Sequence, residues 1–571
     1  MPRFASLLCA LFAAGLALED TGRVESVPGY GPPPTVHHSG FVEVDAATRT
    51  NLFYYLVESQ SAPNADPLIW WFNGGPGASS LAGFLTENGP LLFNTVGEFV
   101  RNPYAWNQAA NVLYVEFGPG VGYSYCANST QAGPSAPCPQ SQGTCSPCPV
   151  SDSTVAHQNL VFIKKLLTEV FPSMAGRPLY LAGESYAGVY IPTLAAAMVE
   201  HFQDTSVVNL HGMWVTDPCT DNKAQFGWID LSVSFCYQKG LISKEVYDAL
   251  SDPAHGCFDG RTPVGDRIRK TGSLECKRSW RLYDIATAGI GDAVQPPEVP
   301  GLPMYIDPLN AYGPAEPANA ADPAEYFSRA DVRAALHATS SPNKVYHLEL
   351  DNNGYTGYDS EYAACNTGEN NGKSMIDVYQ SLLVSAKSAK SASNLKRVII
   401  SSGDIDPVVN LHGTEAAVTA IGLPVSLGGD RRPWFYNSTA ADVDVLVNKP
   451  VQWGPHLRAQ AAGAQVGGFV VNYESSVPGL TFDFVTMRGS GHMVPGYVPQ
   501  RTLHVIYHAL LQGKPLSPLL PADWDSSSED AFYGWKTNEG GAFTAWAKDA
   551  MSDVPTLKQG TASLGETTIF V

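Results

Sequence analysis

Short apolar segments that end abruptly in glycine-rich turns constrain the fold of this chain more than any other feature. Residues 68–72 read Leu-Ile-Trp-Trp-Phe, and Asn-Gly-Gly-Pro-Gly follows at 73–77. Further apolar runs, each followed within a few positions by glycine, occupy residues 112–115, 179–182 and 398–400, and the apolar residues Phe482, Phe484, Val485 and Met487 precede Gly489. Short apolar runs with such boundaries predict strands that are buried on both faces.

Helical periodicity fills the space between several of these runs. Between residues 154 and 171, apolar side chains recur at helical spacing, and another helix is expected to follow Gly183 and continue through Met198. Strands that alternate with helices and end in glycine are typical of a largely parallel sheet. We therefore predict an α/β fold with a central, mostly parallel sheet and helices on both faces.

Composition divides the chain into segments. The core of the fold is expected in two parts, residues 25–220 and residues 326–515. Between them, residues 221–325 contain cysteine, proline and many charges, which predicts a lid-like insertion over the sheet. Residues 516–571 are rich in serine, aspartate and glycine with scattered aromatic residues, and we interpret them as a C-terminal extension.

Length and charge limit the classes of function. With 571 residues, of which 44% are hydrophobic, the chain can build one large enzyme core with insertions. The net charge is −19, from 35 Lys+Arg and 54 Asp+Glu. An acidic surface argues against nucleic acid or an anionic membrane as the main partner.

The N-terminus has the pattern of a secretory signal peptide. Arg3 supplies the positive start, residues 7–18 form an apolar run, and small residues near Ala17 offer a cleavage point. The run is too short to span a membrane, and no second run of spanning length follows. We expect residues 1–17 to be removed and the mature protein, without a membrane anchor, to be extracellular or in a lysosome or vacuole. A soluble N-terminal helix is the alternative.

Cysteines and sequons fit this compartment. Ten cysteines are present, and loss of Cys9 with the signal peptide leaves nine, so at least one thiol is free or intermolecular. The Cys145-Ser146-Pro147-Cys148 motif is compatible with zinc or redox chemistry, but disulfides are the simpler interpretation in a secreted chain. Sequons at Asn128 and Asn437 predict glycosylation.

Ser185 is the candidate nucleophile. It lies in Gly-Glu-Ser-Tyr-Ala-Gly, residues 183–188, between a predicted strand and a predicted helix. Small residues on both sides allow the sharp turn of a nucleophile elbow, which exposes the serine at the carboxyl edge of the sheet. Ala187 departs from the strict G-x-S-x-G pattern. A helix N-cap serine is the structural alternative.

A base and an orienting carboxylate follow in chain order. His492 sits in Gly-Ser-Gly-His-Met-Val-Pro, where a glycine-rich loop can place an imidazole over the sheet edge. Either Asp404 or Asp406, in one compact turn after a strand, can orient that imidazole. The order Ser, Asp, His is that of α/β-hydrolases. Histidines with less loop support, interpreted as structural, are His337, His412 and His456.

Backbone amides complete the requirements of acyl transfer. The loop at residues 73–77 can present N–H groups close to a substrate, because glycine permits such an approach. The N–H of Tyr186, the residue after the nucleophile, is the second expected oxyanion donor. Taken alone, the loop is equally compatible with an ordinary turn.

Together, these segments resemble the serine carboxypeptidase family, the carboxypeptidase Y and cathepsin A-like group. The matching motifs are Trp71–Gly77, Glu87–Pro90, Gly183–Gly188, Gly403–Asp406 and Gly491–Pro495. The likeness runs from about residue 35 to about residue 515. Ala78 stands where many members carry a cysteine, so one usual disulfide is expected to be absent.

The resemblance implies an α/β-hydrolase fold and a catalytic triad. It makes Ser185 the nucleophile, His492 the base and Asp406 the orienting acid. Gly75 and Tyr186 match the positions of the oxyanion hole. No metal or cofactor is required for this chemistry.

The resemblance also implies a site for the terminal carboxylate of a substrate. Asn73 and Glu184 match the residues that hold this carboxylate, and Glu87 matches the carboxyl group paired with Glu184. Met493 corresponds to a residue that lines the site of the departing amino acid. Glutamate can donate to a carboxylate only when protonated, so we expect better peptidase activity at acidic pH.

The resulting prediction is a serine-type carboxypeptidase that removes C-terminal residues from peptides and proteins through an acyl-enzyme. Two alternatives use the same fold: an acyltransferase that passes the acyl group to an alcohol, and a non-catalytic binding or protective protein. The oligomeric state is open. Basic residues at 267–270 and 277–278 are compatible with cleavage into two chains, although solvated charge is the simpler interpretation.

Overall fold

The computed structural model describes most of the chain. The described residues are 22–126, 148, 150–202, 204–225, 229–251, 257, 272–287, 306–307, 309–313, 320–343, 345–348, 350, 358–365, 373–388, 394–438, 463–536 and 540–552. The predicted signal peptide, the sequon at Asn128, Cys138 and Cys145, and the basic residues 267–270 lie outside them. Lys277 and Arg278 lie within a helix.

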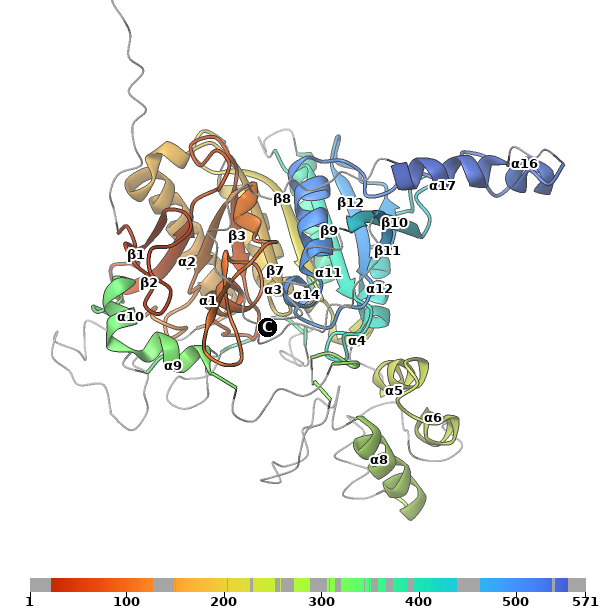
Figure 1. The fold of residues 1–571 in the computed structure, drawn as a ribbon, viewed down its shortest axis with the longest axis horizontal. Coiled ribbons are helices and arrows are strands. Elements are labelled where there is room, and N and C mark those ends of the chain that lie inside the picture. Colours follow the sequence, from red (N-terminus) through yellow and green to blue (C-terminus); the bar gives the residue numbers. More distant parts are fainter. Residues whose placement is uncertain are drawn as a thin grey trace, which may run out of the picture.

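One sheet of ten strands organises the molecule, in the order β1-β2-β6-β3-β7-β8-β9-β12-β11-β10 (Figure 1). The first strands along the chain are β1 (His37–Asp45), β2 (Thr50–Val57), β3 (Leu68–Phe72), β6 (Asn111–Val115) and β7 (Pro178–Glu184). The later strands are β8 (Asn209–Thr216), β9 (Arg397–Gly403), β10 (Arg432–Ser438), β11 (Gly463–Tyr473) and β12 (Thr481–Met487). A separate ribbon pairs β4 (Leu91–Phe93) with β5 (Phe99–Arg101).

The predicted parallel sheet is confirmed for the six central strands. Adjacent strands from β6 through β3, β7, β8 and β9 to β12 all pair in parallel. Antiparallel strands flank them, with β1 and β2 at one edge and β10 and β11 at the other. Because parallel strands share one direction, the turns that follow β3, β7, β8, β9 and β12 meet at the same carboxyl edge.

Helices cover both faces of the sheet (Figure 1). The first face packs against α2 (Asp152–Lys165), α3 (Ala187–His201), α11 (Met375–Lys387) and α12 (Leu411–Ala420). The second packs against α1 (Ser80–Thr86), α9 (Pro323–Ser328), α10 (Ala330–Ala335), α14 (Val494–Tyr497), α15 (Pro499–His504) and η5 (Val505–Leu511). Shorter elements are η1 (Trp106–Gln108), η2 (Leu166–Val170), η3 (Pro172–Met174) and α4 (Asn222–Gln225).

Strand β3 explains why the apolar run at residues 68–72 constrains the fold. Trp70 and Phe72 lie in the core on one face, and Ile69 and Trp71 lie in the core on the other. All four side chains are buried because successive side chains of a strand point to opposite faces. The run is therefore apolar at every position rather than at alternate ones.

Residues of the expected insertion form a small apolar cluster of their own. Helices α5 (Ile229–Gln238), α6 (Lys244–Ser251) and α8 (Leu274–Thr287) pack together around Trp280 and Tyr283. Ile405, in the turn after β9, belongs to this cluster and links it to the carboxyl edge. The division of the chain into core, lid-like insertion and extension remains a prediction.

Two helices follow the second part of the core, α16 (Glu529–Tyr533) and α17 (Ala542–Ser552). They project from the sheet edge that holds β10 (Figure 1). Trp546 of α17 donates its indole N–H to the carbonyl of Pro518 at 3.1 Å. Within the described residues, no helix has the length and apolarity that crossing a membrane would need.

Disulfides are present, as expected for an oxidising compartment. The described cysteine pairs are Cys126–Cys148, Cys219–Cys365 and Cys257–Cys276. Cys219–Cys365 joins the turn after β8 to a segment 146 residues later. Cys236 is buried, forms no disulfide and donates its thiol to the Tyr283 hydroxyl at 3.6 Å, in line with the predicted odd thiol.

Candidate active site

Ser185 lies in a sharp turn between β7 and α3. Its φ of 60° places a residue with a side chain in the left-handed region, which is the strained geometry of a nucleophile elbow. The Ser185 N–H donates to the carbonyl of Thr216 at 3.1 Å, so the end of β8 holds the turn. Helix α3 begins two residues later, at Ala187. The predicted strand, turn and helix are confirmed. The turn forms although Ala187 stands where the strict pattern has a second glycine.

The glycine-rich loop after β3 lies directly against this turn. A Cβ atom on Gly74 would lie 2.5 Å from the backbone nitrogen of Tyr186 and 2.6 Å from the Cβ of Ser185. Gly75 has a φ of 108°, a region that L side chains rarely adopt. Glycine is therefore required here for two reasons, close approach at one position and backbone conformation at the next. The loop brings its amides to the nucleophile.

Asp406 and His492 form a buried pair at the same edge. His492 Nδ1 lies 2.7 Å from Asp406 Oδ2. The carboxylate also accepts the N–H groups of Val408 at 2.7 Å and Val409 at 3.3 Å. The N–H of His492 donates to the carbonyl of Leu309 at 2.8 Å. Three hydrogen bonds to the Asp406 carboxylate and one from the backbone N–H of His492 fix the orientation of the pair.

The environment of His492 favours its cationic form. Burial lowers the pKa of the imidazole, but the charge and hydrogen bond of Asp406 raise it more, and the pKa is raised overall. Smaller contributions in the same direction come from Glu87 and Asp307. An imidazolium that forms during proton transfer is therefore stabilised at this position.

Of the two candidate carboxylates, Asp404 and Asp406, the structure places only Asp406 against the imidazole. Asp404 Oδ1 accepts the N–H of Gly489 at 2.6 Å and makes no contact with the imidazole. Alternate residues of the turn thus point in different directions, as the spacing predicts. Asp404 supports the loop that carries His492.

Ser185 and His492 are both described by the structure, and the hydroxyl of the first makes no hydrogen bond with the imidazole of the second. Catalytic contacts without substrate are often long and tighten only in the reacting complex. The other histidine candidates lie elsewhere: His337 bonds with Ser39, and His412 Nε2 lies 2.6 Å from the side-chain oxygen of Gln238. His456 is outside the described residues.

Asn73, Glu184 and Glu87 meet beside the elbow. The Asn73 Nδ2 group donates to Glu87 Oε1 at 3.0 Å and to Glu184 Oε1 at 2.9 Å. The amide orientation is determined by its other end, because Oδ1 accepts the indole N–H of Trp71 at 2.8 Å and the N–H of Gly83 at 3.0 Å. All three site residues are buried.

The two carboxyl groups hold protons more firmly than usual. Burial raises the pKa of Glu87 to about 7, against the opposing effects of its bonds to Glu184 and Asn73. Burial raises the pKa of Glu184 well above its usual range, and the charge of Glu87 adds to this. Glu87 Oε2 and Glu184 Oε2 are buried and receive no donor from the described residues. A proton on this pair satisfies an oxygen that the protein otherwise leaves without a donor.

Two further predicted site residues are described. Met493 is buried next to His492, directly before α14. Asn437 lies on β10, where its carbonyl accepts the side-chain amide of Gln500 at 3.2 Å. The role of Met493 and the glycosylation of Asn437 remain predictions.

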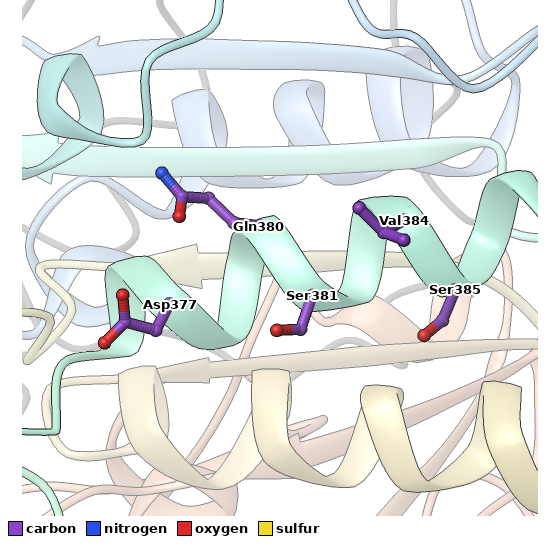
Figure 2. Close-up of a pocket in the computed structure, with 5 residues that line it drawn as sticks. All are labelled: Asp377, Gln380, Ser381, Val384 and Ser385. Carbon is purple, nitrogen blue, oxygen red and sulfur yellow. The ribbon is translucent and has the colours of Figure 1, made fainter.

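Two cavities lie beside α11, and neither is lined by Ser185, Asp406 or His492. One, of about 360 Å³, follows α11 and is lined by Asp377, Gln380, Ser381, Val384 and Ser385 (Figure 2). All five side chains come from a single helix, which offers no converging set of reactive groups. A neighbouring cavity of about 520 Å³ reaches Asp152 between α2 and α3.

Sequence reasoning missed two buried carboxyl groups next to the site. Asp152 accepts the Tyr186 hydroxyl at 3.1 Å and the Tyr358 hydroxyl at 2.7 Å, behind the elbow. Asp217 follows β8 and lies beside Asp406. A polar residue placed directly after a buried strand is the pattern that would have indicated Asp217.

The profile of the serine carboxypeptidase family matches residues 28–512. The chain belongs to this family. Serine carboxypeptidase-like 45 of Arabidopsis thaliana is 28% identical over 521 residues, 89% of this chain and 95% of the relative. Serine carboxypeptidase 1 of Hordeum vulgare is 29% identical over 542 residues, covering 86% and 93%.

A solved structure supports the fold of this family member. The crystal structure of Kex1(delta)p, a prohormone-processing carboxypeptidase from Saccharomyces cerevisiae, superposes with a TM-score of 0.54 at 18% identity. The match covers 87% of this chain and 97% of that one. The predicted α/β-hydrolase fold is confirmed.

Proposed function

We propose that this protein removes C-terminal residues from peptides and proteins by serine-type hydrolysis. Ser185 attacks the last peptide carbonyl, His492 accepts its proton, and Asp406 holds the imidazole in the required orientation. The N–H groups of Gly75 and Tyr186 stabilise the oxyanion. Family membership supports the class of reaction, and the contacts among these residues support the roles.

The observation that carries the proposal is the Asn73–Glu184–Glu87 cluster beside the nucleophile. An exopeptidase must hold a free carboxylate next to the scissile bond. A protonated carboxyl pair, held in place by Asn73, can donate a hydrogen bond to that carboxylate without adding positive charge. A hydrolase of neutral esters has no need for such a cluster. The cluster therefore supports a carboxypeptidase rather than an esterase of this fold.

Chemistry proceeds in two halves. As Ser185 Oγ bonds to the carbonyl carbon, its proton moves to His492 Nε2, and a tetrahedral oxyanion forms. The imidazolium returns the proton to the amine, the peptide C–N bond breaks, and a free amino acid leaves an acyl-enzyme. Water then attacks the ester with the same base, which releases the shortened peptide and restores Ser185. Met493, next to His492, is proposed to line the site of the departing residue.

Glu184→Gln is expected to flatten the pH dependence of peptide KM. In the wild type, the KM of a blocked dipeptide should rise about tenfold between pH 6 and pH 8, because ionisation of the carboxyl pair, in which the pKa of Glu87 is about 7, removes the proton that Glu184 donates to the substrate carboxylate. The raised pKa means that binding is strongest below pH 7 and is lost above it. Glutamine carries no charge and donates at every pH.

The matched control for this test is the same dipeptide with a C-terminal amide. The KM of this amide should not change as the carboxyl pair ionises, because the amide carries no terminal charge. An unchanged KM profile in the Glu184→Gln variant on the free acid would contradict the proposed carboxylate site.

Gly74→Ala is expected to slow acylation of Ser185 about 100-fold, because the added Cβ meets the backbone nitrogen of Tyr186 at 2.5 Å and displaces the elbow. The measurement is the rate of labelling by a fluorophosphonate. Gly40→Ala in β1 is the control, since its Cβ meets only the end of the Tyr54 side chain, at 3.1 Å. Equal labelling of both variants would show that the loop does not bear on the nucleophile.

Several finer features are proposed with this function. The disulfides fit folding in the secretory pathway. Within that pathway, we propose an extracellular, lysosomal or vacuolar location, cleavage of residues 1–17 and glycosylation of Asn128 and Asn437. We also propose that residues 221–325 act as a lid-like insertion that helps to select substrates.

A further inference from the structure

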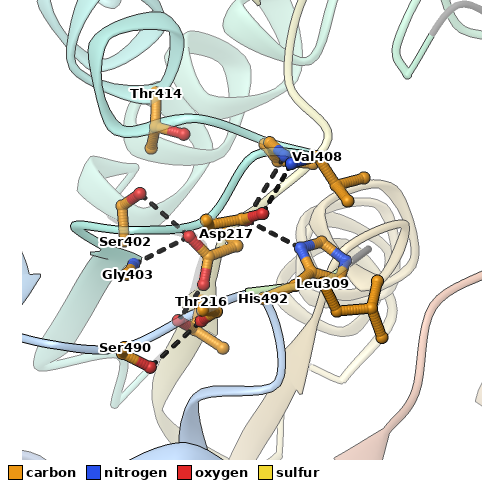
Figure 3. A network of polar contacts seen from close by, with 12 residues as sticks. Thr216, Asp217, Leu309, Ser402, Gly403, Val408, Thr414, Ser490 and His492 are labelled. Carbon is orange, nitrogen blue, oxygen red and sulfur yellow. Dashed lines mark hydrogen bonds and ion pairs between the residues drawn. The ribbon is translucent and has the colours of Figure 1, made fainter. Parts of the chain in front are cut away.

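Asp217 lies at the end of β8, in contact with the residues that support the triad (Figure 3). Its side chain is fully buried, as is that of Asp406. One oxygen of each carboxyl group and one ring nitrogen of His492 all lie within 4.8 Å of one another. Two buried carboxyl groups therefore share the neighbourhood of a single imidazole.

Hydrogen bonds tie Asp217 to the end of β9. Its Oδ1 accepts the hydroxyl of Ser402 at 2.9 Å and the N–H of Gly403 at 2.8 Å, which Figure 3 shows as converging dashed lines. The turn that carries Asp406 begins directly after Gly403. Asp217 thus joins two neighbouring strands at the point where the orienting acid leaves the sheet.

The second oxygen of Asp217 also accepts a hydrogen bond. The hydroxyl of Thr216 donates to Oδ2 at 3.1 Å. Asp406 likewise receives two backbone N–H groups, but it alone also contacts the imidazole, which carries a positive charge when protonated. This partner favours the negative charge on Asp406 over Asp217.

Electrostatics acts in the same direction. Two carboxylates this close in a buried site do not both ionise readily. Burial, followed by the charge of Asp406, raises the pKa of Asp217 well above its usual range. The other ionisable groups that act on this cluster are Glu184 on β7, Glu87 after α1, and Asp307 with its partner Tyr497. They add further carboxyl groups rather than a compensating cation.

We propose that Asp217 is a positioning residue that holds a proton, so that the buried cluster carries its single negative charge on Asp406. This inference rests on the proposed triad. A second charge within 4.8 Å would raise the pKa of His492 further and leave the imidazole protonated at acidic pH. A neutral Asp217 anchors the turn of Asp406 and leaves His492 able to accept a proton.

The test uses two substitutions at this position and the rate of Ser185 acylation by a fluorophosphonate, measured from pH 4 to pH 9. The φ of 44° at Asp217 tolerates glycine and asparagine better than alanine. Asp217→Gly removes the anchor and should lower the acylation rate about 100-fold. Asp217→Asn keeps a neutral group that can accept from Gly403 and donate to Thr216. Its acylation rate should be at least about tenfold higher than that of Asp217→Gly.

The pH profile separates the charge from the anchor. With a neutral Asp217 in the wild type, the acid limb of the Asp217→Asn profile should coincide with that of the wild type. A shift of this limb to lower pH by about one unit or more would show that Asp217 is ionised and would overturn the proposal. This readout also decides the matter if Asp217→Gly does not fold.

Asp483→Ala is the matched control for loss of a half-buried carboxyl group in the sheet. Asp483 lies in β12, bonded to Asn472, and β12 pairs in the same sheet. Its loss should reduce stability without the drop in acylation rate expected of Asp217→Gly. Equal rates for Asp217→Gly and the wild type would also overturn the proposal. Fluorophosphonate labelling requires no peptide substrate, so failure of the carboxypeptidase activity would appear separately, as absent amino acid release.

Discussion

Ser185→Ala is expected to lower kcat on a blocked dipeptide by a factor of about 10⁴ to 10⁶, because no other group in the site can form the acyl-enzyme. KM should change little, since the Asn73–Glu184–Glu87 cluster still holds the substrate. Release of the C-terminal amino acid, quantified with an amine-reactive reagent, is the appropriate measurement. The loss is expected to be this large because Ser185 Oγ forms and breaks the bond to the acyl group, and no step of the proposed reaction proceeds without it.

A fluorophosphonate provides the control for this variant. The wild type should be labelled at Ser185 and the variant should not. Retention of dipeptide hydrolysis in a folded Ser185→Ala protein would contradict the proposed nucleophile. Absence of labelling in the folded wild type would favour the non-catalytic alternative.

Asp406→Asn is expected to lower kcat by about 10⁴. The amide keeps the size of the carboxyl group but carries no negative charge. It therefore cannot both accept the Nδ1–H and stabilise the positive charge of the imidazolium. Asp404→Asn is the matched control in the same turn, because Asp404 meets the Gly489 N–H instead of the imidazole at Nδ1. Its effect should be about tenfold or less.

The pair of variants tests the assignment that residues alone left open. A large effect of Asp404→Asn combined with a small effect of Asp406→Asn would reverse the roles. Differential scanning calorimetry on both variants excludes unfolding as the cause of a lost rate. Both measurements should be made at one acidic pH, where the carboxyl pair is protonated.

Local chemistry made much of the fold predictable. β3 is apolar throughout, and β7, β9 and β12 each contain a short apolar stretch with glycine soon after it, so each was recognisable without its neighbours. The flanking strand β1 mixes histidine, serine and acidic residues with apolar ones, and it is defined by pairing with β2 rather than by its own pattern. The helix expected over residues 154–171 is present, but it changes to a π-helical turn at Leu166–Val170.

The candidate site shows the same limit. The turn around Ser185 and the loop around Gly74 are encoded in a few consecutive residues, and both were predicted. The choice between Asp404 and Asp406 depends on which one faces an imidazole 86 residues later, so it required the three-dimensional arrangement. Asp217 was missed as part of the site for the same reason, since its partners on β9 lie 185 residues away in sequence.

The most direct test of the central claim is amino acid release from an N-blocked dipeptide and from its C-terminal amide, followed between pH 4 and pH 8. We predict Ser185-dependent release from the free acid that is fastest at acidic pH, with KM rising as the pH passes about 7. The contradictory result is a protein that a fluorophosphonate labels at Ser185 but that releases no amino acid and instead transfers an acyl group from an activated ester to an added alcohol.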